Sequence, residues 1–567
     1  MKSDEINQEV EQEILSSEDQ KVSERSSQRC HECVSVDSGF PFKTCPEPVG
    51  FAHLIPRVIR ILILVDGGIS FGNDGFGLSL LIDALNIRSP FTRFDITKAS
   101  RNPFDNSADY PGFSFERDFN PQRFHEVWLL GSESDLRKKL PEKELRILAQ
   151  FMNSGGGVFA TGDHKAMGAA LCGEVPRVRF MRKWFFDPPL PEGQPRAIPP
   201  DNEFRHDTTD RGVDCHYDYE DQTDDVPQMI FPKVYSRADT CSKPRPHEVL
   251  SHRGEPIRFL PDHLHEGECY VPNNLEWRFE FCGYEGEDFP VDPLKKQRRK
   301  PEVIAWAQIP EPHITRNTPL CYPVGQVPTF GVVGAYDGHG LGIGRVVVDS
   351  SFHHFINFNL CGFVKSQDKV SKDKGLQAYD QIKAYFRNIG VWLARRNTRR
   401  EVFNRALAVA LGTYPLIEEI LSLRTAINDK NLGLKDYLTL GAAARSTIAD
   451  LTSPGLASEG TGILLESLLP DSNRGLLQDN RDLAEVIDLL FGINAEVIQD
   501  CFLGGVVANL TRLLEDAGHS SFELSDTEFD ERIAAGALEA PGMFSKLFNR
   551  YSAELGRLAG AFTTDRV

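Results

Sequence analysis

Two side chains suited to acid–base or metal chemistry, Asp163 and His164, follow a short apolar run in this 567-residue chain. Three glycines at 155–157 precede a β-prone run at 158–161, and Gly162 supplies the backbone freedom of a tight turn before an Ala-rich helix. Asp163 and His164 are therefore expected at the carboxyl end of a buried strand. Open α/β sheets bind their ligands at that edge, so this turn is the predicted active site.

Two further histidine pairs could join this turn. His263 and His265 are two residues apart, so in an extended segment both imidazoles point to the same side. His353 and His354 follow another apolar run, and because neighbouring residues of a strand face opposite ways, only one of them is expected in the site. The candidate general bases or orienting residues are Asp66, Asp262, Glu266 and Glu268.

One interpretation of these residues is a metal centre. His164, His263, His265 and Asp163 form a mixed nitrogen and oxygen ligand set that suits zinc, manganese or iron. A divalent transition metal held there would lower the pKa of a bound water and polarise a carbonyl or phosphoryl oxygen. Such a centre is typical of metal-assisted hydrolysis.

Two interpretations without a cofactor stand beside the metal centre. In the first, His353 or His354 acts as acid and base together with Asp163. In the second, the site has no catalytic activity: the His-X-His pair bonds to loop backbone, and Asp163 caps the helix that follows the turn. The residue pattern leaves all three interpretations open.

The order of apolar runs predicts the scaffold of this site. Long β-branched and aliphatic runs that end in turn residues are typical of strands buried on both faces of a parallel sheet, and segments with helical apolar spacing follow several of them. This alternation predicts an α/β fold with an open, mostly parallel sheet and a long insertion at about 190–300. The expected strands are 58–65, 125–131, 158–161, 302–307 and 344–350, and the expected helices are 77–85, 141–153 and about 375–395.

Three motifs in this region resemble the class I glutamine-amidotransferase-like superfamily, and within it the ThuA-like (trehalose-utilisation) proteins. They are GGGVFATGDH at 155–164, PEVIAWA at 301–307, and GRVVVDSSFHHF at 344–355, which a helix containing NIGVWLA follows. The resemblance implies a flavodoxin-like three-layer sandwich over residues 51–395, with a sugar-like substrate bound at the turn. Amidotransferases of this class carry a nucleophilic Cys in that turn. This chain has none there, and Cys172 lies too far along the following helix, so glutamine hydrolysis is not expected.

The two ends of the chain differ from this region. Residues 1–50 are polar and are predicted to be a flexible tail, whose Cys30, Cys33 and Cys45 lack the second close pair of a structural zinc site. Residues 396–567 have helical apolar spacing over 401–423, 434–451, 483–491 and 497–514. We expect an all-α domain there that serves oligomerisation or the binding of a protein partner.

Composition narrows the function. A net charge of −19 argues against broad nucleic-acid binding, and we find no apolar run long enough to cross a bilayer and no secretory signal. Eleven cysteines without a framework spacing favour the reducing cytoplasm. These features favour a cytoplasmic protein. The His and Asp residues at the strand ends, together with the ThuA-like resemblance, which implies a sugar-like substrate, predict a hydrolase or lyase that acts on a small sugar-like or acyl substrate, with or without a metal. The alternative is a non-catalytic amidotransferase-like scaffold or regulatory protein that assembles a complex through its helical domain.

Three other segments have simpler interpretations. Residues 176–184 carry four positive charges beside aromatic residues and could clamp an anionic group. The interpretation we favour is a surface helix end with Arg stems packed on Trp184. The glycine-rich segment 66–77 lacks both the dinucleotide-binding fingerprint and the phosphate-loop lysine, so it is expected to line the site. The basic cluster at 295–300 is expected to be a solvated loop.

Overall fold

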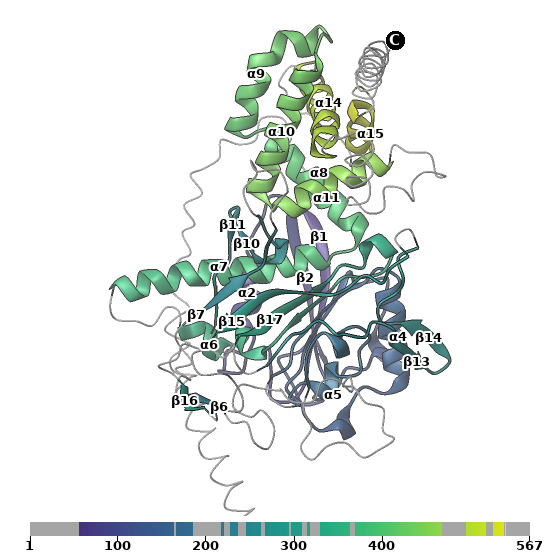
Figure 1. Cartoon of the computed structure of the whole chain (residues 1–567), viewed down its shortest axis with the longest axis vertical. Helices are drawn as coiled ribbons and strands as arrows, with labels where there is room; N and C mark the ends of the chain where they lie inside the picture. Colours follow the sequence, from purple (N-terminus) through teal and green to yellow (C-terminus); the bar gives the residue numbers. More distant parts are fainter. Residues whose placement is uncertain are drawn as a thin grey trace, which may run out of the picture. The chain divides into compact units, whose positions relative to one another are not determined.

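The computed structural model describes residues 56–163, 166–184, 217–219, 227–235, 245–261, 267–293, 296–308, 314–317, 329–362, 369–467, 495–516, 526–537 and 539. The chain forms two compact units, and the main division between them falls between Arg395 and Arg396 (Figure 1). The first unit is an α/β structure and the second is helical.

Four neighbouring parallel strands form the centre of the first unit. They are β18 (Val346–Asp349), β5 (Gly157–Ala160), β4 (Glu126–Leu130) and β1 (Arg57–Val65), in that order across the sheet. Nearly every residue of these strands is buried, because the sheet is covered on both faces. Parallel pairing brings the carboxyl ends of all four strands to one edge, which is where the predicted active site falls.

The sheet continues on both sides of this centre. The described residues form ten strands in the order β12-β7-β15-β17-β18-β5-β4-β1-β2-β3, and pairing alternates in direction from β12 to β18. β17 was not predicted from the sequence, and β7 and β12 come from the segment at 190–300, which was expected to be only an insertion. The bounds are β2 (Thr92–Ser100), β3 (Tyr110–Pro111), β7 (Gln228–Pro232), β12 (Phe259–Leu260), β15 (Glu302–Gln308) and β17 (Thr329–Tyr336).

Among the described residues, four small two-stranded sheets accompany the large sheet. They pair β6 (Tyr217–Tyr219) with β16 (Ile314–Asn317), β8 (Val234–Tyr235) with β9 (Arg245–Pro246), β10 (Ser251–His252) with β11 (Glu255–Pro256), and β13 (Arg278–Phe281) with β14 (Tyr284–Glu287).

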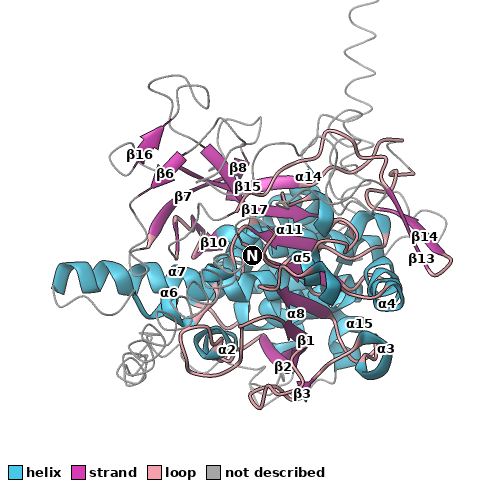
Figure 2. Ribbon diagram, turned by 90° about the horizontal axis from the view of Figure 1, so that it is seen from below, coloured by secondary structure: helices cyan, strands magenta, loops and turns pink. Residues whose placement is uncertain are grey.

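Helices cover both faces of the central strands, as Figure 2 shows for α4 (Glu142–Asn153) and α7 (Lys369–Leu393). Alternate residues of β5 show the reason: Val158 and Ala160 belong to one core with the apolar residues of α4. The Phe159 ring instead packs on Phe355, which packs on the α7 side chain of Phe386. The remaining helices of this unit are α2 (Ser79–Leu85), α3 (Phe115–Asp118), α5 (Ala169–Cys172) and α6 (Asn357–Gly362), with 3-10 turns η1 (Leu136–Lys138), η2 (Val178–Phe180), η3 (Glu248–Leu250), η6 (His339–Leu341) and η7 (Phe352–His354).

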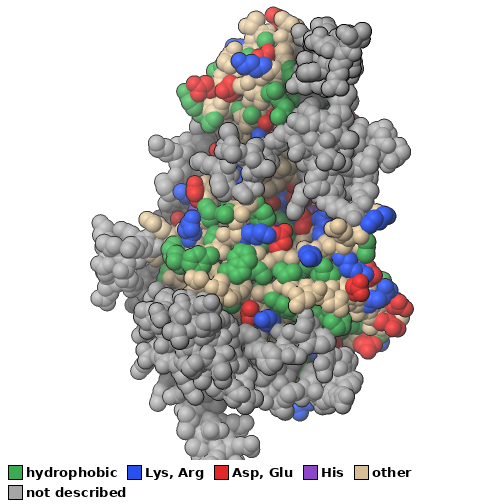
Figure 3. All heavy atoms as spheres, in the orientation of Figure 1, with side chains coloured by type: hydrophobic (Ala, Val, Ile, Leu, Met, Phe, Trp, Pro, Cys, Tyr) green, Lys and Arg blue, Asp and Glu red, His purple; other side chains and the backbone are tan. Residues whose placement is uncertain are grey.

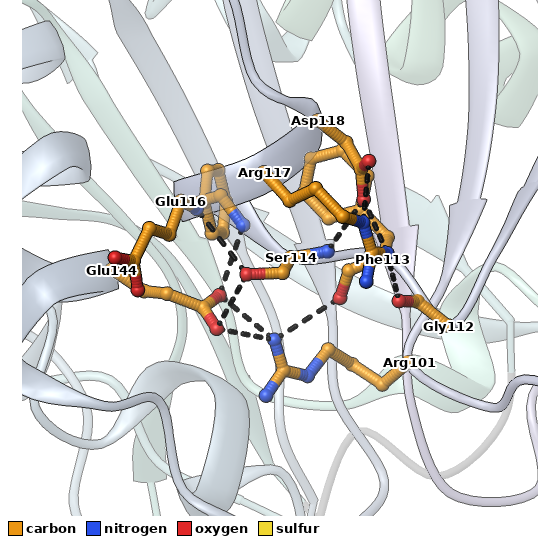
Figure 4. Close-up of polar contacts among 9 residues, drawn as sticks. Arg101, Gly112, Phe113, Ser114, Glu116, Arg117, Asp118 and Glu144 are labelled. Carbon is orange, nitrogen blue, oxygen red and sulfur yellow. Dashed lines mark hydrogen bonds and ion pairs between the residues drawn. The ribbon is translucent and has the colours of Figure 1, made fainter.

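A buried carboxylate joins α3 to α4 (Figure 4). Glu144 of α4 accepts hydrogen bonds from Arg101 Nη1 on both oxygens, at 3.1 and 2.8 Å. Ser114 Oγ and Phe115 N also donate to Glu144, each at 3.1 Å, and Arg101 Nη1 donates to Phe113 O. These donors compensate a carboxylate charge that is removed from water. The network therefore fixes α3 and α4 relative to each other.

The second unit consists of helices in its described part. The expected helix at 401–423 is two helices, because the chain turns at Gly412 and Thr413. Gly441 and Gly504 let α10 and α14 approach closely: a Cβ on either glycine would lie within 2 Å of the backbone of the opposite helix. The bounds are α8 (Arg396–Ala410), α9 (Tyr414–Asn428), α10 (Leu434–Leu451), α11 (Pro454–Ser467), α14 (Ala495–Asp516) and α15 (Asp526–Ala537).

One described helix, α14, has over Val497–Asp516 the length and apolar composition of a membrane span, but 67% of that window is buried within the structure. A buried core helix has the same composition. Residues 1–50, with their cysteines, and the expected helix at 483–491 lie outside the described residues.

The basic cluster contributes ion pairs within the α/β unit. Arg298 donates to Glu287 at 2.9 Å and to Phe289 O at 2.7 Å, and Arg299 donates to Asp337 O at 3.1 Å. On the face drawn in Figure 3, basic and acidic side chains of the described residues are interspersed.

Candidate active site

The carboxyl ends of β5 and β18 bring Asp163 together with Ser351 and His353. Because the two strands are parallel neighbours, the residues that follow them meet, and Phe352 N donates to Gly162 O at 2.8 Å. Ser351 Oγ donates to Asp163 Oδ1 at 2.6 Å, and His353 Nε2 lies 3.5 Å from Asp163 Oδ2. A buried carboxylate therefore faces a hydroxyl on one oxygen and an imidazole on the other.

The local fold after β18 explains how one serine serves two partners. Ser351 precedes the 3-10 turn η7, and its Oγ accepts a hydrogen bond from His353 N at 3.1 Å, as an N-cap does. The same hydroxyl donates to Asp163. His353 and His354 were expected to diverge as neighbouring residues of a strand do. They lie instead in a 3-10 turn, in which successive residues differ by about 120°, so the two side chains still diverge.

His353 is held between two oxygen atoms. Its Nδ1 lies 3.0 Å from Oδ1 of Asn359 in α6, while its Nε2 faces Asp163. A protonated imidazole, which has two N–H donors, satisfies both contacts at once. The ring stacks on Phe352 with centroids 4.6 Å apart, and 15% of the histidine side chain is exposed. His353 is thus the member of the pair that can reach a substrate.

His354 turns into the core instead. It is fully buried, and its Nδ1 lies 2.6 Å from Asp349 Oδ1, which also accepts from Ser351 N at 3.1 Å. The hydroxyl of Tyr385 in α7 donates to the other Asp349 oxygen at 2.6 Å. Burial, and then the nearby Asp349 charge, raise the pKa of Tyr385 well above its usual value. Asp349, His354 and Tyr385 therefore form a support beneath the site.

Arg182 ties the two site loops together. Its guanidinium donates to the carbonyl oxygens of Asp163, Ser350 and Lys183, and it stacks over Trp184 at 4.5 Å. Burial lowers the pKa of Arg182, which is completely enclosed. The expected packing of an arginine on Trp184 is present, but the expected surface position is wrong, because this segment belongs to the core.

Gly162 is required by close packing and not by its backbone angles. Its φ is not positive, but a Cβ there would lie 2.8 Å from Arg182 Cζ and 2.8 Å from a Trp184 ring carbon. The helix after the turn, α5, begins behind Gly168, which has φ +85° and supplies no side-chain cap. The interpretation of Asp163 as the cap of that helix is therefore wrong.

Asp66 is buried at the end of β1 and bonds to the loop after β4. Its Oδ1 accepts from Ser132 N at 2.7 Å and from Glu133 N at 3.0 Å. Burial raises the pKa of Asp66 to about 6, and the two backbone donors oppose this shift. Gly67 follows with φ +60°, a conformation that favours glycine. A Cβ there would also lie 2.2 Å from Ser132 Oγ, so no other residue fits this turn. These two hydrogen bonds of Asp66 join the end of β1 to the loop that follows β4.

Glu268 is described, and its Oε2 accepts a hydrogen bond from Lys183 Nζ at 3.2 Å. Five further predicted site residues lie outside the described residues. These are His164, Asp262, His263, His265 and Glu266. Within the described part of the chain, no three His, Cys, Asp or Glu side chains are grouped so that they could hold a metal ion. Since three of the four expected ligands are not described, the metal centre stays a prediction.

The cysteine after the turn has the environment of a core residue. Cys172 is fully buried in α5, its Sγ lies 3.8 Å from Leu129 O, and burial raises the pKa of its thiol. A thiol kept neutral in this way is a poor nucleophile.

Sequence reasoning missed Ser351, Asn359, Arg182 and Tyr385. The signal for Ser351 was available, since a serine two residues before His353 is a typical cap.

Comparison of the chain with family models, curated proteins and solved structures finds no match in any of the three.

Proposed function

We propose that Asp163 and His353 are the proton-transfer centre of a hydrolase or lyase that acts on a small polar substrate, sugar-like or acyl. The observation that carries this proposal is the 3.5 Å separation between His353 Nε2 and Asp163 Oδ2, at the ends of two parallel strands. Ligands bind at this edge in open α/β sheets, and a partly exposed imidazole beside a buried carboxylate can exchange a proton with them.

His353 acts first as the general acid. Its Nε2 proton passes to the leaving oxygen of the substrate, while Asp163 stabilises the imidazolium before transfer. In a hydrolase, a water molecule then adds its hydroxide to the electrophilic carbon and returns its proton to the neutral ring. In a lyase, the returning proton comes from the carbon next to the bond that breaks. Asn359 keeps the ring oriented in both cases by its contact with Nδ1.

The proposal includes the finer family assignment, a flavodoxin-like sandwich of the class I amidotransferase-like, ThuA-like kind that lacks the nucleophilic cysteine. It is supported by the strand order β18-β5-β4-β1 and by helices on both faces of these strands. A divalent metal is part of the proposal only if His164, His263 and His265 join Asp163. Metal analysis of the wild type and of a His263→Ala/His265→Ala variant tests that addition.

The experiment is a turnover assay of the full chain on a panel of p-nitrophenyl glycosides and p-nitrophenyl acyl esters. We expect release of p-nitrophenol from at least one class, reduced about 10²–10⁴-fold in His353→Gln and in Asp163→Asn. His252→Gln, a change in the small sheet of β10 and β11, is the matched control and should keep the wild-type rate. Wild-type turnover in His353→Gln, or no turnover of any panel member, contradicts the proposal.

The non-catalytic alternative predicts that substitutions at Asp163 and His353 have no effect on function. If the chain is a scaffold that assembles a complex through residues 396–567, the site variants leave its binding to partners unchanged, and removal of the helical unit abolishes assembly. Light scattering of the full chain measures the oligomeric state that both versions leave open.

A further inference from the structure

The ring of Phe76 lies beside the proposed site. Phe76 belongs to the segment between β1 and α2, and its ring centroid is 6.5 Å from that of His353 and 6.5 Å from that of Phe352. Phe352 is buried, whereas 44% of Phe76 is exposed. His353 thus has an aromatic residue stacked beneath it and a second, partly solvent-exposed ring at its edge.

The segment that carries Phe76 is tied to the segment that carries the histidine. Asn357, at the start of α6, donates from Nδ2 to Gly72 O at 3.1 Å and to Asp74 O at 2.9 Å. Its backbone N–H also donates to Gly77 O at 2.8 Å. These bonds hold Phe76 in a fixed position relative to the site before any ligand arrives.

The segment is also closed on itself. Ser70 N donates to Phe76 O at 3.3 Å, and Leu78 N donates to Ser70 O at 3.0 Å. Gly77 packs so tightly that a Cβ would lie 2.0 Å from Gly72 O. An exposed aromatic ring on a rigid segment loses little conformational entropy on binding, so its apolar area is available to a ligand.

From this arrangement we infer that Phe76 determines substrate specificity and that the substrate is a cyclic polyol or a sugar ring. Such a molecule presents a C–H face that packs on an aromatic ring and hydroxyl groups that bond to a carboxylate and an imidazole. Its C–H face lies against Phe76, and its hydroxyl groups lie toward Asp163 and His353. The inference rests on the function proposed above and narrows its substrate class.

The test is ligand binding by saturation-transfer NMR and calorimetry. The probes are the methyl pyranosides of glucose, galactose and mannose together with myo-inositol, and the acyclic polyol sorbitol is the comparison. Four proteins are compared: wild type, Phe76→Ala, Phe76→Tyr and Asp163→Asn. Since Phe76 is partly exposed, both of its variants are expected to fold, and their thermal transitions verify this.

We expect at least one cyclic probe to bind the wild type and to bind Phe76→Ala about tenfold more weakly, a change of about 1.4 kcal/mol, because the substitution removes the aromatic surface that contacts the probe. Phe76→Tyr should stay within about twofold of wild type, because the ring is kept. The affinity for sorbitol should be the same in the wild type and in Phe76→Ala. The inference is overturned if Phe76→Ala binds the cyclic probes with the affinity of the wild type. It is also overturned if no cyclic probe binds the wild type.

The Asp163→Asn arm separates the two proposals. Loss of binding in Asp163→Asn without loss in Phe76→Ala would contradict the role of Phe76 and leave the proton-transfer centre standing. Weakening in Phe76→Ala with unchanged binding in Asp163→Asn would support the ring site and contradict the role of the Asp163 and His353 pair.

Discussion

The hydroxyl of Ser351 donates a 2.6 Å hydrogen bond to Asp163 Oδ1 across 188 positions of sequence. It also accepts from His353 N, so one side chain sets the position of the acid and of the histidine. The bond links the ends of β5 and β18 in the interior, where Asp163 is removed from water.

The first prediction concerns that hydroxyl. Ser351→Ala leaves a buried carboxylate oxygen without its donor, so we expect a loss of about 1–3 kcal/mol in the free energy of unfolding. Ser350→Ala is the matched control, because Ser350 Oγ is buried but has no hydrogen-bond partner among the described residues. Urea unfolding of both variants should separate them, and equal losses would show that the Asp163 contact contributes nothing.

The second prediction concerns the turn. Gly162→Ala places a methyl group 2.8 Å from both Arg182 and Trp184, and we expect it to cost about 1–3 kcal/mol. At Gly68 a Cβ meets nothing within 4 Å and φ is not positive, so Gly68→Ala should be neutral or stabilising by up to about 1 kcal/mol. Thermal unfolding compares the two, and an unaffected Gly162→Ala would contradict this packing.

The third prediction concerns the support beneath the site. Tyr385→Phe removes the donor to one oxygen of buried Asp349, and the expected cost is about 1–3 kcal/mol. Tyr336→Phe is the control, since the Tyr336 hydroxyl is buried without a partner in the described part of the chain. A larger loss in the control than in Tyr385→Phe would refute the role of Tyr385.

The fourth prediction is a pH dependence. Burial raises the pKa of Asp66 from 3.8 to about 6, so the native state binds its proton more tightly than the unfolded state between these values. The contribution of Asp66 to the free energy of unfolding is fully present below pH 3.8 and is lost as the pH rises through about 6. Asp66→Asn avoids that loss, so it should be more stable than wild type by roughly 1–3 kcal/mol at neutral pH.

The difference in the free energy of unfolding between Asp66→Asn and wild type should vanish near pH 3.8, because the native side chain is then neutral in both proteins. Urea unfolding at about pH 4 and about pH 7.5 measures it. A constant difference across this range would mean that the carboxyl titrates normally in the folded state.

Strand positions were predictable where the apolar runs were long. The run at 58–65 is β1, and the runs at 125–131 and 158–161 contain β4 and most of β5, because strands buried on both faces admit few polar residues. The helix at 141–153 is α4, set by its amphipathic spacing. β7 and β12 lie in a Pro- and Asp-rich segment without a clear period, and only their pairing within the sheet makes them strands.

The candidate site was predictable in part. Asp163 was expected to meet one of His353 and His354, because each site segment follows an apolar run that could end at the same edge of a sheet, but the sequence did not say which histidine. The role of Arg182 was not predictable, since a buried arginine is rare and its partners are backbone carbonyls that sequence does not reveal. The separate fates of His353 and His354 depend on the 3-10 turn that Ser351 caps.

The most direct measurement of the central claim is ¹⁵N NMR of the protein labelled at histidine, with the His353 signals assigned through a His353→Gln variant. If His353 is an imidazolium between Asp163 and Asn359, both of its ring nitrogens will give protonated signals near neutral pH. In Asp163→Asn at least one of them will lose its proton. An unprotonated His353 nitrogen in the wild type at that pH would contradict the proposal that this residue is the general acid.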